Sequence, residues 1–344
     1  MTKLENILSQ TQSQRLVFGV VACIESGDGR IHWSGATGNL AVDDQYFIAS
    51  TTKLYTAAIV LRLRSEGLLH LNDKLEKYFA DELLSGIHVF KGKDYSREIN
   101  IRQLLSQTSG IADYFLGKRA SGKSLEASIT SGSDQSWTFE DVIADVKKMP
   151  AAFPPGKKGK ALYSDTNYQL LGRIIEIASG KSYEEALKHY VFSPLGLDKT
   201  YLYTDTNDTR PVNIYYKSTP LNIPGAMVST GPDGGIVSTA RESMVFLKAF
   251  FGGGVFPVEY VKELGAWNRI FFPLEYGLGV MRYKLPRIFY GFRPFPEFIG
   301  HSGLSGAFAY FCPVKDLYIT GTVNQIAKPG TAYKMMLQLS DSAR

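Results

Sequence analysis

An uncharged, strongly apolar helix constrains the fold of this chain more than any other segment. Residues 54–61, Leu-Tyr-Thr-Ala-Ala-Ile-Val-Leu, have no charge, and the first charged residue after them is Arg62. A helix that is apolar on nearly every side is buried within a protein rather than laid on its surface. The sequence therefore predicts a central helix over about residues 51–66, with Gly67 as its C-terminal stop.

Ser50 and Lys53 stand at the beginning of this helix. A spacing of three places both side chains on one helix face, about one turn apart, so the amine can reach the hydroxyl. A hydroxyl needs a nearby base to become a nucleophile, and burial makes the neutral amine easier to populate. The alternative is a serine at a helix N-terminus followed by an ordinary solvated lysine. Composition alone produces this spacing about once in a chain of this length.

Length and charge bound the class of protein. At 344 residues the chain suggests two domains or one large mixed domain. Its 44% hydrophobic and 21% charged residues are typical of a globular protein. The net charge of +5 is spread along the chain, and its densest basic run, residues 157–160, is too small for a nucleic-acid footprint. We expect no nucleic-acid partner.

Cysteines and the N-terminus give two further expectations. Cys23 and Cys312 form neither a disulfide framework nor a metal-ligand spacing with the histidines, so we expect two small buried residues and no metal site. The N-terminus lacks the layout of a signal peptide. The longest early apolar run, residues 16–24, is too short to span a bilayer. These features predict a cytoplasmic protein without a membrane span.

Predicted strands lie near both ends of the chain, and predicted helices lie between them. Hairpins are predicted over residues 15–33, at the edge of a sheet, and over residues 307–323. Further strands are predicted at 234–239 and 276–280, and helices at 101–107, from 142, at 167–178, from 182 and at 332–339. The fold class is therefore α/β of the α+β type, with residues 1–65 and 215–344 forming a sheet domain. Residues 66–214 form a mostly helical inserted domain.

Tyr163 and Asp165 precede one of the predicted apolar helices. A tyrosine in a short loop is most often a packing residue with a satisfied hydroxyl. Near a cationic lysine, however, a phenol can be stabilised as phenolate and carry protons. Asp165 can face the same cleft or simply cap the helix that follows.

Residues 300–306, Gly-His-Ser-Gly-Leu-Ser-Gly, precede a predicted strand. His301 titrates near neutrality and can donate a hydrogen bond to a substrate. Glycines allow a backbone N–H to approach a ligand closely, as an oxyanion site requires. The alternative is a tight hairpin turn with His301 exposed.

Together these segments resemble the serine β-lactamase and penicillin-binding protein superfamily, in the branch that holds class C β-lactamases, DD-peptidases, D-aminopeptidases and β-lactamase-like esterases. The superfamily pattern is Ser-x-x-Lys, then Tyr-x-Asn, then Lys/His-x-Gly. Here it reads Ser50-x-x-Lys53, Tyr163-Ser164-Asp165 and His301-Ser302-Gly303. Connecting segments also resemble the family, among them residues 104–111, 193–197 and 234–239. The resemblance implies an antiparallel sheet flanked by helices, a mostly helical second domain, and a cleft between them.

The resemblance also implies acyl transfer without a metal or organic cofactor. Ser50 would attack a carbonyl, while Lys53 and Tyr163 would remove and relay its proton. Backbone N–H groups of Ser50 and Leu304 would hold the oxyanion. Asp165, His301, Ser302 and Gly303 would bind the substrate, a small ester, amide or β-lactam-like molecule.

Two departures from the family pattern bear on substrate choice. Asp165 stands where the family usually has asparagine, and His301 replaces the lysine typical of β-lactamases. An anion at Asp165 would favour the ammonium form of Lys53, so either Asp165 is protonated or Tyr163 does more of the proton transfer.

Three functions are therefore weighed. The first is a cytoplasmic serine hydrolase of esters or small amides. The second is a D-alanyl-D-alanine carboxypeptidase, D-aminopeptidase or β-lactamase, and the third is a non-catalytic binding or sensing domain. The four retained residues Ser50, Lys53, Tyr163 and His301 argue against the third.

One aromatic segment, residues 282–298, has three possible roles. Residues 282–298 contain Phe289, Tyr290, Phe292, Phe295 and Phe298, together with three arginines and three prolines, just before His301. Such a segment can rim the cleft, pack on its own body or form a contact in a homo-oligomer.

Overall fold

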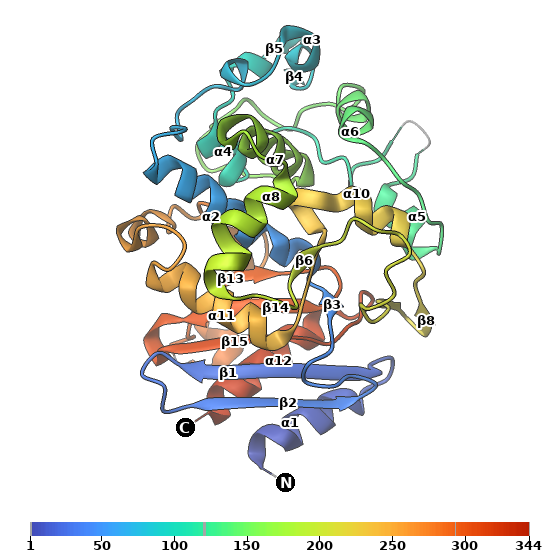
Figure 1. The fold of residues 1–344 in the computed structure, drawn as a ribbon, viewed down its shortest axis with the longest axis vertical. Coiled ribbons are helices and arrows are strands. Elements are labelled where there is room, and N and C mark those ends of the chain that lie inside the picture. The colour runs from blue at the N-terminus through green and yellow to red at the C-terminus, as the bar shows by residue number, and fades with distance from the viewer. Residues whose placement is uncertain (1, 120–121, 293, 344) are drawn as a thin grey trace.

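Both ends of the chain build one antiparallel sheet (Figure 1). The computed structural model describes residues 2–119, 122–292 and 294–343, and within them this sheet has eight strands in the order β10-β11-β12-β13-β14-β15-β1-β2. The strands are β1 Gly19–Ser26, β2 His32–Gly38, β10 Asn268–Phe271, β11 Leu274–Tyr276, β12 Met281–Tyr283, β13 Phe298–Ser302, β14 Ala307–Cys312 and β15 Leu317–Thr322. The N-terminal β1 pairs with β15 near the C-terminus, Cys23 opposite Thr320.

Helices cover both faces of the sheet. On one face lie α1 Lys3–Gln12 and α12 Pro329–Ser342, which contact each other and strands β2 and β15 respectively. On the other face lies α11 Ala240–Gly252, where the Thr320 hydroxyl donates a hydrogen bond of 2.7 Å to the Ala240 carbonyl. Because β1 is covered on both sides, residues 20–24 are at most 3% exposed. This explains why β1 reads as a continuous apolar run rather than an alternating one.

The helical part of the molecule packs around α2 Thr52–Ser65 (Figure 1). Helix α2 contacts α7 Asp165–Ser179 and α10 Pro224–Gly234, and α4 Ile101–Leu105 also packs on α7. Residues 52–61 of α2 are all buried, so the predicted central helix is confirmed. The remaining helices are α3 Asp81–Leu84, α5 Leu125–Thr130, α6 Phe139–Val146, α8 Tyr183–Leu187 and α9 Ser193–Leu195.

A small sheet of strands β3 Tyr46–Phe47, β9 Ile236–Ser238 and β6 Tyr201–Leu202 fixes the entry to α2. Its hydrogen bonding continues past β3, since the backbone N–H of Ile48 donates to the carbonyl of Ile236 at 3.1 Å. Two short hairpins, β4 Val89–Phe90 with β5 Lys93–Asp94 and β7 Tyr215–Tyr216 with β8 Thr219–Pro220, complete the strands. The division into domains at residues 65 and 215 stays a prediction.

The predicted hairpins at the two ends are confirmed, and β2 forms an edge of the sheet as expected. The strand predicted over residues 276–280 is wrong, because the chain turns there between β11 and β12. Gly279 has a φ of 78°, and a Cβ at Gly277 would lie 2.0 Å from the Leu264 carbonyl oxygen. The two glycines therefore serve a tight turn packed against neighbouring backbone and not a strand.

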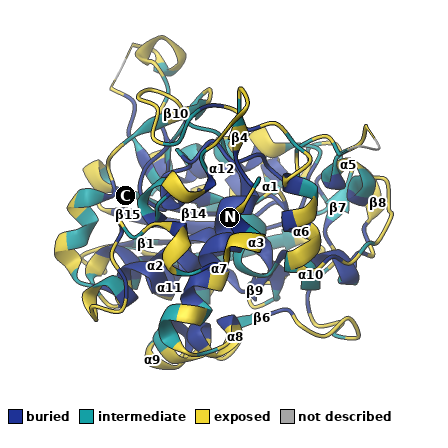
Figure 2. Cartoon of the chain, turned by 90° about the horizontal axis from the view of Figure 1, so that it is seen from above, coloured by how far each residue is buried: buried dark blue, intermediate teal, exposed yellow. Residues whose placement is uncertain are grey.

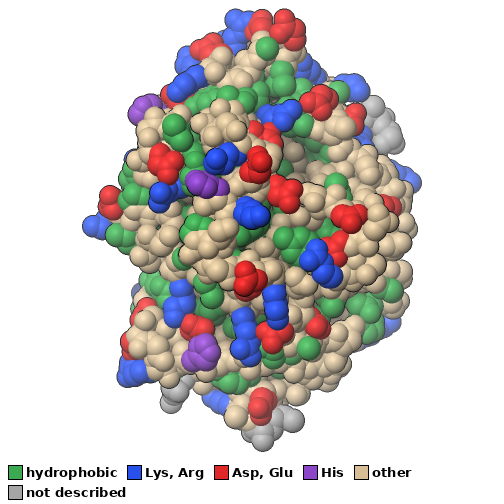
Figure 3. Space-filling view, viewed as in Figure 1, with side chains coloured by type: hydrophobic (Ala, Val, Ile, Leu, Met, Phe, Trp, Pro, Cys, Tyr) green, Lys and Arg blue, Asp and Glu red, His purple; other side chains and the backbone are tan. Residues whose placement is uncertain are grey.

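Buried residues lie at the centre of the molecule, and most charged residues lie on its surface. Figure 2 shows the buried residues concentrated in the centre, on the sheet and the helices that cover it. On the face seen in Figure 3, basic and acidic side chains are interspersed and form no single-sign patch. Among the described residues no helix has the length and hydropathy needed to cross a bilayer.

Candidate active site

Ser50 lies in a 3-10 turn, Ala49–Thr51, that leads directly into α2. Ala49 has a left-handed backbone with φ 45°, a conformation that is uncommon for non-glycine residues and concentrates at active sites. The turn between β13 and β14 approaches this backbone closely. A Cβ on Gly303 would lie 2.3 Å from the Ile48 carbonyl oxygen, so only glycine lets the sheet come this near to Ser50.

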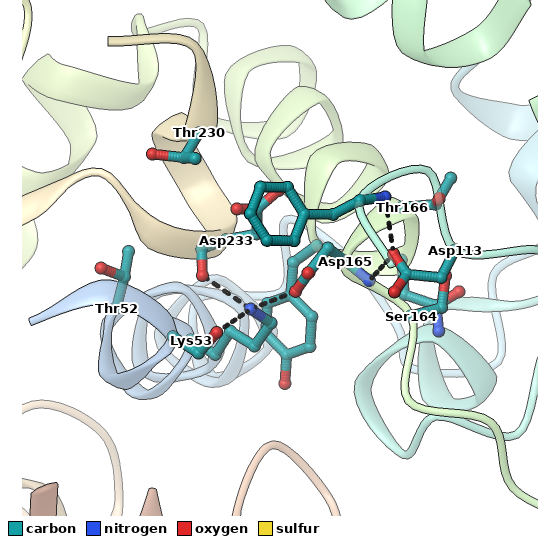
Figure 4. Close-up of polar contacts among 12 residues, drawn as sticks. Thr52, Lys53, Asp113, Ser164, Asp165, Thr166, Thr230 and Asp233 are labelled. Carbon is teal, nitrogen blue, oxygen red and sulfur yellow. Dashed lines mark hydrogen bonds and ion pairs between the residues drawn. The ribbon is translucent and has the colours of Figure 1, made fainter. Parts of the chain in front are cut away.

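Lys53 is fully buried, and its amine is surrounded by oxygen atoms (Figure 4). Its Nζ lies 3.1 Å from Ser50 Oγ, 2.6 Å from the carbonyl oxygen of Asp233 and 2.6 Å from Asp165 Oδ1. The contact with Asp165 has the distance of an ion pair. The solvated lysine considered as an alternative is therefore wrong.

Tyr163 brings a second proton-bearing group to Ser50. Its side chain lines the same cavity as Ser50, and its ring centroid lies 5.3 Å from Lys53 Nζ. Burial, reinforced by the negative charge of Asp165, raises the pKa of the Tyr163 phenol well above its ordinary value of 10.0. Burial therefore opposes the phenolate that the sequence suggested, and the neutral phenol is the resting form.

Two further buried carboxyl groups, Asp113 and Asp233, lie near Asp165, with Asp113 on the side of Asp165 away from Lys53 (Figure 4). Asp165 begins α7, and its backbone N–H donates to Asp113 Oδ1 at 3.1 Å. The carboxyl of Asp233 accepts hydrogen bonds from the Tyr114 hydroxyl at 2.8 Å and from Gln169 Nε2 at 2.9 Å. Asp165 thus faces the cleft, and its side chain does not act as a helix cap.

Mutual repulsion and burial keep these carboxyls from all being ionised. Burial, followed by the charge of Asp165, raises the pKa of Asp113 from 3.8 to about 7. The same two causes, in the same order, raise the pKa of Asp233 well above its ordinary value. Since like charges held close together in a low dielectric share protons, the cluster stores protons next to Lys53.

His301 lies on β13 with its side chain fully buried. Its Nδ1 lies 2.9 Å from the Ser302 carbonyl oxygen, which can only accept, so Nδ1 carries the proton. Nε2 therefore accepts from the Tyr276 hydroxyl at 3.2 Å, and the Tyr276 oxygen contacts the Tyr168 hydroxyl at 2.8 Å. Burial, and then the charge of Lys53, lowers the pKa of His301 to about 3. His301 is thus a neutral, buried histidine. The alternative of a tight hairpin turn with His301 exposed is wrong.

Two cavities meet at Ser50 and share Asp165 and Leu304 in their walls. The larger, of about 210 Å³, is also lined by Tyr163, Ser302 and Gly303 and by apolar side chains. These apolar residues include Phe115, Leu116, Phe271, Leu274 and Met281. The smaller cavity, of about 60 Å³, is lined mainly by apolar residues of segments 214–230 and 304–326. A separate groove of about 460 Å³ along residues 206–224 does not include Ser50.

The structure therefore gathers the residues predicted from the three motifs. Ser50, Tyr163, Asp165, Ser302, Gly303 and Leu304 line the larger cavity, while Lys53 and His301 lie behind its wall, in contact with Ser50 and Ser302 respectively. Sequence reasoning missed Asp113, Asp233 and Tyr276. Asp113 and Asp233 each flank a segment with family resemblance, residues 104–111 and 234–239, and that adjacency was the available indication.

The described residues contain no cluster of three or more histidine, cysteine or acidic side chains arranged to hold a metal ion. Cys23 and Cys312 are free, buried thiols on strands β1 and β14. Burial raises the pKa of Cys23 to about 12, so this thiol is not a nucleophile.

Comparisons with known proteins agree with this geometry. Residues 4–335 match the sequence profile of the β-lactamase family. The chain is 32% identical over 176 residues to penicillin-binding protein 4 of Amycolatopsis lactamdurans, covering 51% of this chain and 40% of that protein. It is 26% identical over 318 residues to a putative D-alanyl-D-alanine carboxypeptidase of Escherichia coli strain K12, covering 83% of this chain and 70% of that protein. The match therefore spans less than half of the first relative and about two thirds of the second.

Among solved structures, a D-stereospecific amidohydrolase from a Streptomyces species superposes with a TM-score of 0.77. The two sequences are 25% identical, and the superposition covers 96% of this chain and 97% of the other. The profile match extends over nearly the whole sequence and includes all three motifs at the site. The chain therefore belongs to the β-lactamase family of serine hydrolases.

Proposed function

We propose that this chain hydrolyses small esters or amides through an acyl-enzyme on Ser50. The observation that carries the proposal is the placement of Ser50. Its Oγ lies 3.1 Å from Lys53 Nζ, and Ser50 stands at the junction of two apolar cavities, the larger of which is also lined by Tyr163. A hydroxyl with two proton carriers in reach and room for both substituents of a carbonyl is suited to nucleophilic catalysis.

The proton path follows from the surroundings of Lys53. When Ser50 Oγ attacks the carbonyl carbon, its proton passes to Lys53 Nζ, and Asp165 Oδ1 at 2.6 Å stabilises the ammonium that forms. Tyr163 then donates its proton to the leaving group and is reprotonated from Lys53. Water cleaves the acyl-enzyme through the same groups in reverse.

Backbone N–H groups of Ser50 and Leu304 hold the oxyanion in this proposal. Both residues line both cavities, so a carbonyl carbon bound at Ser50 Oγ places its oxygen beside them. Ser302 and Gly303 bind the substrate along the edge of β13. His301 does not line the cavity, and its role is to position other residues. Its neutral ring donates a hydrogen bond to the Ser302 carbonyl and accepts one from the Tyr276 hydroxyl.

The linings favour apolar substrates without an acylamino group. The larger cavity is walled mainly by apolar side chains, which suit an apolar acyl or alcohol group. Asp165 lies in both walls, and an ionised carboxylate only accepts hydrogen bonds, so it cannot pair with an amide carbonyl of a β-lactam or D-alanyl peptide. Simple esters lose nothing at this position.

A second candidate is hydrolysis of D-amino acid amides or D-peptides. The similarity to the Streptomyces D-stereospecific amidohydrolase and to the putative D-alanyl-D-alanine carboxypeptidase supports it. In such substrates a free ammonium group would find Asp165 a suitable partner, which an acylated amine would not.

A substrate panel separates the two candidates. The panel contains p-nitrophenyl butyrate, D-phenylalanine amide, N-acetyl-D-phenylalanine amide and a chromogenic cephalosporin, each assayed with the native chain and with Ser50→Ala. The proposal expects the highest kcat/KM for the ester and loss of all turnover in Ser50→Ala. Faster cleavage of D-phenylalanine amide would favour the second candidate. Turnover of every substrate by a folded Ser50→Ala variant would contradict both.

A further inference from the structure

Two loops beside the mouth of the larger cavity expose an unusual number of phenylalanines. One is formed by Phe271, the last residue of β10, and the turn residues 272–273 that lead into β11, and the other is the segment 284–292, which follows β12 and leads toward β13. We call their five exposed apolar residues the phenylalanine patch: Phe271, Phe272, Ile288, Phe289 and Phe292, which are between 51% and 75% exposed. Among the described residues, every phenylalanine more than 36% exposed lies in this patch. Exposed apolar clusters of this kind mark interaction surfaces.

The patch is one surface that stands off the body of the molecule. The rings of Phe272 and Phe289 lie 6.0 Å apart, which joins the two loops. Figure 2 shows the second loop projecting as an exposed turn beside β10. Its base is anchored in the core, because Phe295 is buried and its ring lies 5.2 Å from that of Tyr290. The exposed side chains are therefore presented on a supported loop and are not the product of a loose chain end.

Basic side chains surround the phenylalanine patch. Between residues 269 and 297 the sequence has five basic residues and two acidic residues, and Glu297 lies 3.3 Å from Arg282 and 3.7 Å from Lys284. Arg269, Lys284 and Arg287 are exposed. Arg269 and Lys284 also line a groove of about 320 Å³ between the two loops, together with Phe272, Leu285 and the ion pair of Arg282 with Glu275. Projecting aromatic side chains with a basic rim match the chemistry of an anionic lipid surface, where rings enter the apolar region and cations meet phosphate groups.

The patch is also continuous with the active-site cavity. Phe271 belongs to the patch and lines the larger cavity, whose wall includes Ser50. The route from Phe271 to Ser50 passes apolar side chains, among them Leu116, which is 49% exposed. A molecule leaving a lipid surface at the patch would therefore reach the serine without crossing a polar barrier.

We infer that the phenylalanine patch docks this protein on an anionic lipid surface and that Ser50 receives esters partitioned into that surface. The docking half rests only on the patch and its charges, whereas the delivery half rests on the proposed function. Docking on lipid is favoured over a contact between two copies because the rim is predominantly basic, and two such rims would repel each other.

Vesicle co-sedimentation of the full chain tests the docking half without using activity. The probes are vesicles of phosphatidylcholine alone and vesicles that also contain phosphatidylglycerol. We expect binding to the second kind only, weakened by added salt. The variant Phe272→Ser/Phe289→Ser/Phe292→Ser should bind about 100-fold more weakly, because three rings lose an apolar environment. Arg269→Glu/Arg287→Glu should also lose binding. Val314→Ser, which removes a side chain that is 75% exposed on the β14–β15 turn, is the matched control and should bind as the native chain does.

Two comparisons keep the outcomes distinct. Ser50→Ala should bind vesicles as the native chain does, so loss of catalysis leaves the docking result intact. The triple phenylalanine variant should retain hydrolysis of a short-chain ester in solution, since none of its three positions lines the larger cavity. It should lose hydrolysis of a long-chain ester embedded in anionic vesicles. Absence of vesicle binding by the native chain, or equal binding by the triple variant, would overturn the proposal. So would a native dimer that the triple variant converts to monomers, since the patch would then be a contact between copies.

Discussion

Replacing Asp113 with asparagine should change how stability depends on pH. In the folded protein this carboxyl keeps its proton up to about pH 7. In the unfolded chain its pKa has the ordinary value of 3.8, so the carboxyl loses its proton at a much lower pH. The folded state thus binds more protons between these values, and the free energy of unfolding falls as pH rises through the window. A pKa shift of this size lowers the free energy of unfolding at pH 8 by about 4 kcal/mol relative to its value at low pH. Asp113→Asn removes this loss.

The substitution also has a pH-independent cost. Asp113 accepts hydrogen bonds from the backbone N–H groups of Phe115 and Asp165 through Oδ1, and from that of Leu116 through Oδ2. An asparagine that keeps the first two leaves the Leu116 N–H without its acceptor, at about 1–3 kcal/mol. The variant should therefore be less stable than the native chain at pH 4 and more stable at pH 8, as measured by urea unfolding.

Asp141→Asn is the matched control. Hydrogen bonds from Thr138 lower the pKa of Asp141, so its contribution to stability is present at pH 8 and shrinks as pH falls. Because this loss begins only below the ordinary pKa of 3.8, its replacement should cost about the same at pH 8 and at pH 4. If the effect of Asp113→Asn is likewise the same at pH 4 and pH 8, Asp113 is ionised in the folded protein and the proton-storing role of the cluster is wrong.

Three other predictions concern the site directly. Tyr163→Phe and Lys53→Ala should each lower kcat/KM by about 10²-fold or more, and the double variant should be little worse, because both act in one relay; fully multiplicative losses would indicate separate roles. Asp165→Asn should raise the ratio of cephalosporin to ester turnover by about tenfold, since an amide can donate to the acylamino carbonyl; an unchanged ratio would mean that Asp165 does not contact the substrate. His301, with a pKa lowered to about 3, should show no titration between pH 5 and 8 in its NMR ring resonances, and a step in that range would contradict the assigned hydrogen bonds.

The parts of the fold that sequence predicts are those in which local pattern and burial agree. Residues 54–61 of helix α2 are uncharged and all buried, and β1 and β15 are largely apolar strands at opposite ends of the chain that pair in the core. The turn at 276–280 was mistaken for a strand because Tyr276, Leu278 and Val280 alternate with glycines. That alternation matches strand periodicity, while the real constraint is the close approach of other backbone to Gly277.

At the site, spacing predicts which residues meet but not how they ionise. The three-residue spacing predicts that Ser50 and Lys53 meet, and in the structure Ser50 Oγ lies 3.1 Å from Lys53 Nζ. The protonation of Tyr163 and His301 depends on burial and on charges from distant segments, so the sequence left a phenolate at Tyr163 and an exposed His301 open as alternatives. Asp113 and Asp233 reach Asp165 and Lys53 only through the packing of α7 and α10, which no local pattern reveals.

The most direct test of the account is covalent labelling of Ser50. A fluorophosphonate probe reacts with an activated serine hydroxyl, and peptide mass spectrometry of the labelled chain locates the adduct. The account predicts one modified peptide, the one that contains Ser50, no adduct in Ser50→Ala, and slower labelling in Lys53→Ala. Unchanged labelling of a folded Ser50→Ala variant, or an adduct on a different serine of the native chain, would contradict the claim that Ser50 is the nucleophile.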